Sequence, residues 1–173
     1  MNNNLREIKI EKVTLNIGVG KTGDELERAS ALLKRITDQK PVLTKTMERI
    51  PTWGLRPKLP IGAKVTVRKQ QASLLLKRLL KAVNNNIPES KFDKYGNLSF
   101  GIPEYIDIEG AEYDPKTGII GLEAAVTLER AGFRVKKRRV KKTRVGNRQK
   151  ITKQEAINFM KSQFNITTGD KEE

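Results

Sequence analysis

The sequence predicts an α+β fold, a mostly antiparallel sheet with helices packed on one face and a polar face turned outward. Two observations carry this prediction. Segments 8–17 and 63–68 alternate apolar and polar residues, as half-buried strands do. Segments 24–36 and 70–83 repeat apolar residues every three or four positions, as helices that cover a sheet do.

The first strand is followed by a glycine-containing turn at 18–23 and by the first helix. The strand has two faces, with Val13, Leu15 and Ile17 on one side and Lys12, Thr14 and Asn16 on the other. Ile8 and Ile10 have the opposite phase, which predicts a β-bulge near Glu11. Pro41 ends the helical pattern, because proline cannot donate the next backbone hydrogen bond.

The middle of the chain predicts a short strand at 42–45, a long loop at about 46–61, and then the second clear strand and second helix. The loop is rich in proline, which restricts its backbone. The strand at 63–68 places Lys64, Thr66 and Arg68 on its polar side. The helix that follows this strand is expected to end at the run from Asn84 to Pro88.

The last third predicts two or three strands within 97–129, of which 122–128 is the most regular. Phe133 and Val135 are expected to begin another strand. Thr152 and Glu155 form a capping box, which predicts the start of a final helix. We expect one domain over 1–169 with an internal basic extension at about 134–150, and a frayed end at 170–173.

Charge is abundant and unevenly distributed. Lysine and arginine number 35 against 20 acids, a net charge of +15. Residues 34–81 contain thirteen bases and two acids, and residues 130–153 contain twelve bases and no acid, whereas residues 89–129 contain nine acids and three bases. This segregation predicts two surfaces that face an anion, and RNA is the favoured candidate.

Several functional classes are disfavoured by composition. The chain has no cysteine and no histidine, so the commonest metal ligands and the usual general base are missing. We expect no metal, no cofactor and no catalytic residues. No apolar run approaches the ~20 residues that span a bilayer, and the N-terminus does not resemble a signal peptide. The expected setting is the cytoplasm, without a membrane partner.

The polar face of the sheet is the first candidate RNA surface. Lysine and arginine attract phosphate, while asparagine and threonine can bond to ribose hydroxyls and base edges. The residues concerned are Lys12, Thr14, Asn16, Lys64, Thr66 and Arg68. The alternative is that they form only the solvent side of an amphipathic sheet.

The basic run is the second candidate. Its residues include Arg134, Lys136, Lys137, Arg138 and Arg139. So high a charge density predicts a segment with no fold of its own until it lies against phosphate. Trp53, the only tryptophan, lies in the proline-rich loop, where it either anchors the loop on the core or exposes a ring that stacks on a base.

The Gly20-Lys21-Thr22 turn raises an enzymatic alternative. It follows a strand and precedes a helix, as a phosphate-binding P-loop does, but the required first glycine is replaced by Leu15. We therefore keep a phosphate-handling enzyme as one alternative, and a basic adaptor for an acidic protein or an anionic membrane as another. A turn that offers backbone N–H groups to RNA phosphate is also compatible with these residues.

Four segments together resemble one family. IEKVTLNIGVG at 10–20, QKPVLTK at 39–45, PIGAKVTVR at 60–68, and Phe92-Asp93 with Gly96-Asn97 resemble, in order and spacing, the L-five family of universal large-subunit ribosomal proteins. The likeness covers about residues 5–165. The stretch at 130–133, the basic run and the last helix resemble the archaeal and eukaryotic branch, and a bacterial Phe-Arg-Gly signature is absent, so the chain resembles an archaeal-type member.

The resemblance implies a set of partners and contacts. Members of the family bind 5S rRNA at the central protuberance of the large subunit and contact large-subunit rRNA and a protein of the small-subunit head. The positions that match the family's 5S rRNA contacts are Asn16, Gln39 and Thr66, with Lys40, Lys64 and Arg68 nearby. The family's long loop reaches the P-site tRNA, which here implies a role for Arg49, Trp53, Arg56 and Lys58.

Overall fold

The computed structural model describes residues 5–169, and its centre is a five-stranded antiparallel sheet. The strands are β1 (Ile8–Gly18), β2 (Val42–Lys45), β3 (Pro60–Arg68), β4 (Leu98–Ile102) and β5 (Leu122–Arg130). Their order is β2-β3-β1-β5-β4, with β1 in the middle, and every neighbouring pair is antiparallel. The predicted α+β class is confirmed, whereas the expected fraying at 170–173 lies outside the described residues.

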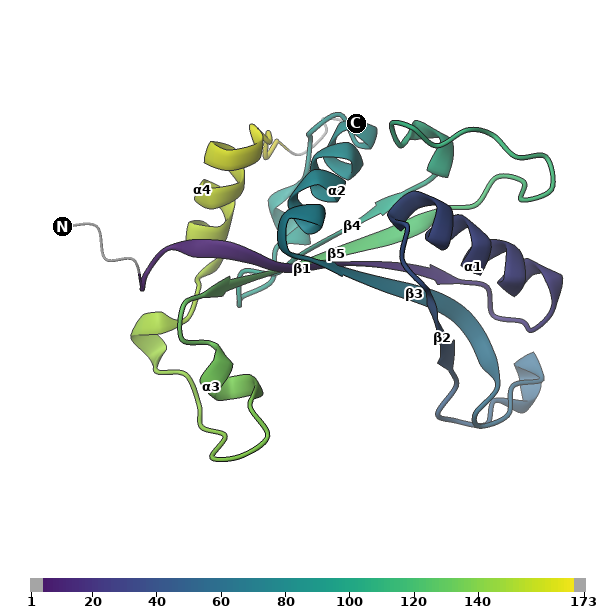
Figure 1. Ribbon diagram of the computed structural model, residues 1–173, viewed down its shortest axis with the longest axis horizontal. Helices are drawn as coiled ribbons and strands as arrows, with labels where there is room; N and C mark the ends of the chain where they lie inside the picture. Colours follow the sequence, from purple (N-terminus) through teal and green to yellow (C-terminus); the bar gives the residue numbers. More distant parts are fainter. Residues whose placement is uncertain (1–4, 170–173) are drawn as a thin grey trace.

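Three helices lie on one side of the sheet (Figure 1). They are α1 (Asp24–Thr37), α2 (Lys69–Ala82) and α4 (Lys153–Phe164). Two segments project from the opposite side: the short helix α3 (Arg134–Lys137) with the chain that follows it, and the loop between β2 and β3. The sheet therefore has a covered face and an open face that two projections flank.

The core lies between the sheet and the three large helices. Alternate residues of each central strand are buried, as their period of two requires, and the helices bury one stripe each. Leu15 of β1, Leu33 of α1 and Leu76 of α2 are fully buried. Each such side chain contributes about 1.5–3 kcal/mol by leaving water, so this layer supplies most of the drive to fold.

Two details of the sheet follow from single residues. The pairing of β1 with β5 shifts register between Ile10 and Lys12, which confirms the β-bulge predicted near Glu11. Gly62 lies where β3 crosses close to its neighbours. A Cβ there would stand 2.8 Å from Thr44 Oγ1 and 2.9 Å from the Ile17 carbonyl oxygen, so only glycine lets the three strands approach this closely.

The last third agrees with the prediction in one place and differs in another. Residues 97–129 contain two strands, β4 and β5, as predicted, and the chain between them is a loop with a 3-10 turn at Tyr105–Asp107. The strand expected at Phe133 and Val135 is wrong. Gly132, with a φ of 93°, turns the chain away from the sheet after β5, and the residues that follow form α3 instead.

The final helix begins with the predicted capping box, and the remaining helical segments are short 3-10 turns. The capping box of α4 is present, because Thr152 accepts from the Glu155 backbone N–H while the Glu155 carboxylate accepts from the Thr152 N–H. Three more 3-10 turns lie at Pro51–Trp53, Glu89–Lys91 and Asn147–Gln149. Within residues 5–169, no helix combines the length and the apolar character that crossing a bilayer requires.

Candidate nucleic-acid interface

The open face of the sheet gathers the polar residues that the strand pattern predicted. The register pairs Lys12 with Arg68, Thr14 with Thr66 and Asn16 with Lys64, so all six side chains share one face of β1 and β3. Helices cover the opposite face. We call this open side the polar face; it also includes Glu123, Ala125 and Thr127 of β5 and Ser99 and Gly101 of β4.

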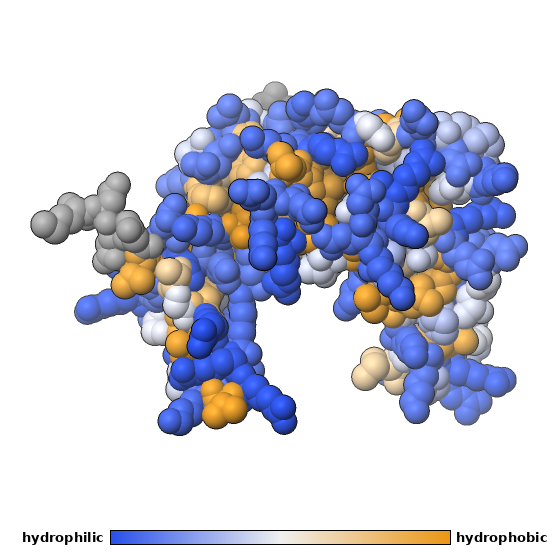
Figure 2. Space-filling view, viewed as in Figure 1, coloured by the Kyte–Doolittle hydropathy of each residue, from blue (hydrophilic) through white to orange (hydrophobic). Residues whose placement is uncertain are grey.

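The polar face forms the floor of a concave surface, which Figure 2 shows as a hollow between the two projections. The hollow lies between the two projections seen in Figure 1, and its walls are mostly hydrophilic. Both Lys64 and Arg68 are exposed, while Thr14, Asn16 and Thr66 are half-buried by their neighbours in the sheet. A rigid, concave surface of cations, hydroxyls and amides suits the backbone of a folded RNA.

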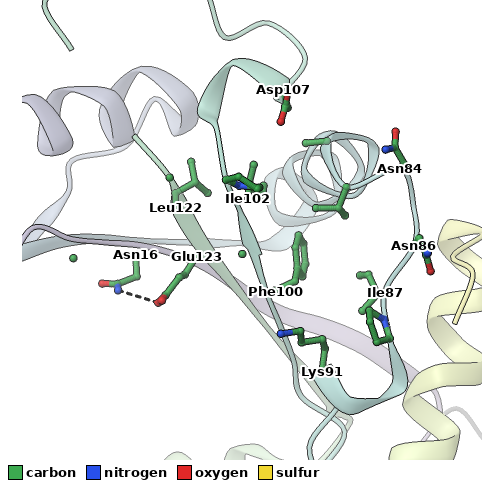
Figure 3. A pocket seen from close by; sticks show the side chains of 17 residues that line it. Asn16, Asn84, Asn86, Ile87, Lys91, Phe100, Ile102, Asp107, Leu122 and Glu123 are labelled. Atoms are coloured by element: carbon green, nitrogen blue, oxygen red, sulfur yellow. Dashed lines mark hydrogen bonds between the residues drawn. The ribbon is translucent and has the colours of Figure 1, made fainter. Parts of the chain in front are cut away.

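The polar face includes one acid that the sequence analysis did not single out. Glu123 of β5 stands opposite Asn16 in the register, and Asn16 Nδ2 donates to Glu123 Oε2 at 3.3 Å (Figure 3). This bond orients the Asn16 amide and leaves its second N–H and its carbonyl oxygen free to meet a ligand. Asn16 is therefore a positioned side chain rather than a mobile one.

A second acid organises the other end of the face. Glu11, at the bulge, has a side chain only 9% exposed, and it accepts from Arg68 at 3.2 Å and from Lys137 Nζ at 2.8 Å. Lys137 also contacts Glu129 Oε2 at 2.6 Å. Burial opposes ionisation of Glu11, but the hydrogen bonds from Lys137 and Arg68, with the charges of Lys137 and Lys12, outweigh it and lower its pKa. The acid thus fastens α3 to the sheet.

The same contacts also shift the pKa of Lys137. Burial alone would lower its pKa, yet the bonds to Glu11 and Glu129 dominate and raise it. The ammonium therefore stays charged across the physiological range. Its charge is already matched within the protein, so Lys137 has less attraction left for RNA than its place in the basic run suggests.

The basic run forms a compact projection, the basic arm, at residues 134–150. Gln149 Nε2 donates to the Ala131 carbonyl oxygen, and the Thr143 N–H donates to the Val135 carbonyl oxygen, so the arm closes on itself. The sequence predicted no fold here. The prediction was wrong for α3, because Glu11 and Glu129 neutralise Lys137. The side chains of Arg134, Lys136, Arg139, Lys141, Lys142 and Arg144 remain exposed.

The loop between β2 and β3 forms the other projection. Thr46, nearly buried, fixes its base, because its N–H donates to the Leu59 carbonyl oxygen and its hydroxyl donates to the Arg56 carbonyl oxygen. The loop carries the residues that the family resemblance implied for tRNA contact: Arg49, Trp53, Arg56 and Lys58, all exposed. Trp53 is 73% exposed, so the core-anchor alternative for this ring is wrong.

Two predicted residues lie away from the polar face. Gln39 is in the connection between α1 and β2, and its amide donates to Gln71 Oε1 of α2 at 3.0 Å, on the helical side. Lys40, next to it, is exposed beside the edge strand β2. The structure therefore separates Gln39 and Lys40 from the six residues of β1 and β3.

The glycine turn does not form a phosphate cradle. The N–H groups of Val19 and Gly20 both donate to the Ile61 carbonyl oxygen, so they are not available to a ligand. The first turn of α1 carries three acids, Asp24, Glu25 and Glu27, which would repel phosphate. The expectation that this turn offers its N–H groups to RNA is corrected for these two residues.

Two acids of the acid-rich segment pair with cations of the helices. In the loop between β4 and β5, Glu109 pairs with Lys81 of α2 at 2.8 Å, and Asp114 with Arg35 of α1 at 3.9 Å. These contacts lower the pKa of Glu109, chiefly through Lys81. Basic residues of the helices are thus partly neutralised, while on the open side Lys64 and most cations of the basic arm have no acid paired with them within the described residues.

Figure 3 shows a groove beside the edge strand β4. Its carboxylates do not cooperate, because Asp107 lies on the 3-10 turn at one side and Glu123 is held by Asn16 at another. Among residues 5–169, no cluster of three or more acids, histidines or cysteines could hold a metal ion. The groove offers no acid–base or metal chemistry.

Comparison with known proteins matches this chain to one family. Residues 3–56 match the family model described as Ribosomal protein L5, and residues 60–159 match that of the ribosomal L5P family C-terminus. The "Large ribosomal subunit protein uL5" of Nanoarchaeum equitans is 52% identical over 167 residues, covering 96% of this chain and 98% of the relative. The protein of the same name from Sulfolobus acidocaldarius is 48% identical over 165 residues, covering 95% and 93%.

These matches show that the chain is a structural, RNA-binding protein of the ribosome and not an enzyme. The chain belongs to the ribosomal protein L5 family and is of the archaeal type. The two matched segments share one sheet, because β1 from the first pairs with β3 and β5 from the second. The phosphate-handling enzyme raised by the glycine turn is ruled out by this membership.

Proposed function

We propose that the chain lies in the large subunit of the cytoplasmic ribosome and binds 5S rRNA with its polar face. The single observation that supports this most is the register, which brings Lys12, Thr14, Asn16, Lys64, Thr66 and Arg68 onto one open face. Glu123 and Glu11 orient two of these groups. In this role the protein positions RNA and carries out no chemistry.

The two projections extend the proposal to further partners. The basic arm supplies Arg134, Lys136, Arg138 and Arg139 to 5S rRNA or to the large-subunit rRNA at the central protuberance. The loop between β2 and β3 presents Trp53 and its three cations to the P-site tRNA, and the same end of the molecule contacts a protein of the small-subunit head. The exposure of these residues, on a loop whose base is fixed by hydrogen bonds, supports this assignment.

A binding experiment tests the polar face. The full chain is titrated against a 5S rRNA transcript and against a structured control RNA of equal length, at several salt concentrations. Neutralising ~6–10 phosphates predicts a fall in affinity of about 10³–10⁵ between 50 and 200 mM salt. A preference for 5S rRNA is expected, and equal affinity for both RNAs would refute the assignment.

Single substitutions locate the contact. Thr66→Ala removes a hydroxyl from the centre of the face and should weaken 5S rRNA binding by about 5- to 150-fold, the effect of leaving one buried partner unsatisfied. Thr22→Ala changes an exposed threonine in the glycine turn and should leave affinity unchanged. If Thr66→Ala binds as the wild type does, the polar face is not the 5S rRNA surface.

The loop is tested on assembled subunits. Large subunits carrying the double variant Trp53→Ala, Arg56→Ala should crosslink less to P-site tRNA than wild-type subunits do. Both side chains are exposed, so the fold should be unaffected. Unchanged crosslinking would remove the loop from the tRNA contact and leave the 5S rRNA assignment standing.

A further inference from the structure

We propose that a cavity between the basic arm and the turn at 93–97 binds one unpaired RNA nucleotide, with its base on the ring of Tyr95 and its phosphate on cations of the arm. This inference rests on the proposed function and adds a second site to it. The site differs in kind from the polar face, because it reads a base that has left the helix.

The cavity has the size and lining of a small-ligand site. Its volume is about 650 Å³, within the usual range for such pockets of ~300–1,000 Å³. Leu128 of β5, Phe133 and Ile151 provide an apolar lining, and Tyr95 with Asn97 forms one wall. Residues of the arm provide the rest of the lining. An apolar lining with polar walls suits a flat aromatic base.

Tyr95 is held in a turn fixed by hydrogen bonds, although the residue is 57% exposed. The Asp93 carboxylate accepts from the Tyr95 N–H at 2.8 Å, from the Asn97 N–H at 2.8 Å and from Asn97 Nδ2 at 2.7 Å. A Cβ on Gly96, whose φ is 77°, would stand 2.7 Å from Ile151 Cγ2. The turn therefore packs directly against the end of the arm and fixes the ring at the cavity.

Charge identifies the rest of the ligand. Four cations besides Lys137 line the cavity, Lys136, Lys142, Arg144 and Lys150, and its one carboxylate, Glu11, is already paired with Arg68 and Lys137. Within residues 5–169, the side chains of Lys142 and Arg144 have no hydrogen-bond or ion-pair partner. Lys94 Nζ adds a further cation 5.2 Å from the Tyr95 ring centroid. Cations without a partner can bind a phosphate, and the exposed ring next to them can stack on the base of the same nucleotide.

The geometry favours an unpaired nucleotide over a duplex. In A-form RNA the base faces are stacked and out of reach, so an aromatic side chain can cover only a base that has been released. The adjoining polar face supplies contacts to the sugar-phosphate backbone, so a folded RNA could lie there while one nucleotide turns into the cavity.

The test compares ring variants of the full chain in 5S rRNA binding. Tyr95→Ala should weaken binding by about 5- to 150-fold, as loss of one base–aromatic stack does, without changing the slope of log affinity against log salt. Tyr95→Phe keeps the ring and should restore affinity to within about twofold. Arg144→Ala should weaken binding and reduce the salt slope by about one.

Tyr113→Ala is the matched control, because Tyr113 is 56% exposed and lies in the loop between β4 and β5, outside the cavity. Its affinity should equal that of the wild type. Wild-type affinity in Tyr95→Ala, or no recovery in Tyr95→Phe, would overturn the inference. Urea unfolding of each variant checks that the fold is intact.

Short ligands separate this site from the polar face. A labelled single-stranded hexanucleotide should bind in a Tyr95-dependent way, whereas a six-base-pair duplex should not. This result would stand even if the chain showed no preference for 5S rRNA, so the two proposals can fail separately. Tyr95-dependent binding of free AMP as tight as that of the hexanucleotide, or displacement of the hexanucleotide by polyglutamate, would overturn the assignment to RNA.

Discussion

Glu11 is expected to stabilise the protein although it lies on a surface that faces an anion. Glu11→Gln removes the charge that holds Arg68 and Lys137. Two charge-assisted hydrogen bonds contribute about 1.5–3 kcal/mol each at most. The two cations have side chains 55% and 41% exposed, so water compensates them when the acid is gone. We therefore expect a loss of about 1–2 kcal/mol in the free energy of unfolding.

The assay is urea unfolding followed by circular dichroism, with the free energy extrapolated to water. The pH dependence gives a second readout. The folded-state pKa of Glu11 is lowered, so its contribution is fully present above the unfolded pKa and is lost as pH falls through the folded pKa. The difference between wild type and variant should therefore be largest at neutral pH and shrink in acid. Trypsin should also cleave the basic arm faster in the variant, because α3 loses one of its two anchors.

Glu7→Gln is the control, since its pair with Lys9 has side chains 60% and 65% exposed and should contribute less than about 1 kcal/mol. The reasoning fails if Glu11→Gln matches the wild type at neutral pH. It also fails if the difference persists unchanged at a pH where the wild-type acid is protonated.

Three other changes test the fold by the same unfolding measurement. Gly62→Ala should cost about 1–3 kcal/mol, because its Cβ would meet the Ile17 carbonyl oxygen at 2.9 Å, and unchanged stability would mean the strands can separate freely. Leu76→Ala empties a fully buried site and should cost about 2–5 kcal/mol, so a loss below that range would show that the core collapses around the gap. Thr152→Ala removes the helix cap and should cost about 1 kcal/mol, whereas Thr152→Ser should retain most of it.

Most of the sheet could be predicted because strand alternation is a local signal. The period of two in 8–17 and 63–68 placed six polar residues on one face, and the register agrees. The phase change at Ile10 located the bulge. The strands and helices that formed the core were those whose apolar pattern was most regular.

The features that were missed depend on contacts between distant parts of the chain. Helix α3 forms where Glu11, more than a hundred residues away, neutralises Lys137, and no local pattern carries that information. Gln39 turns toward the helices because Gln71 is there to receive it. Tyr95 sits in a turn with no periodicity, and its exposure at a cavity depends on the arm that packs beside it.

The position of β1 has a consequence for how the protein is made. Of the five strands of the sheet, β1 leaves the translating ribosome before the others although it lies in the middle, and it pairs with β5 at Lys9 and Glu129 only after the chain between them has been synthesised. Until then, the backbone groups along one edge of β1 have no partner strand, and long-range pairings of this kind form slowly. Nascent chains of this protein should therefore depend on chaperones until about residue 130 has emerged.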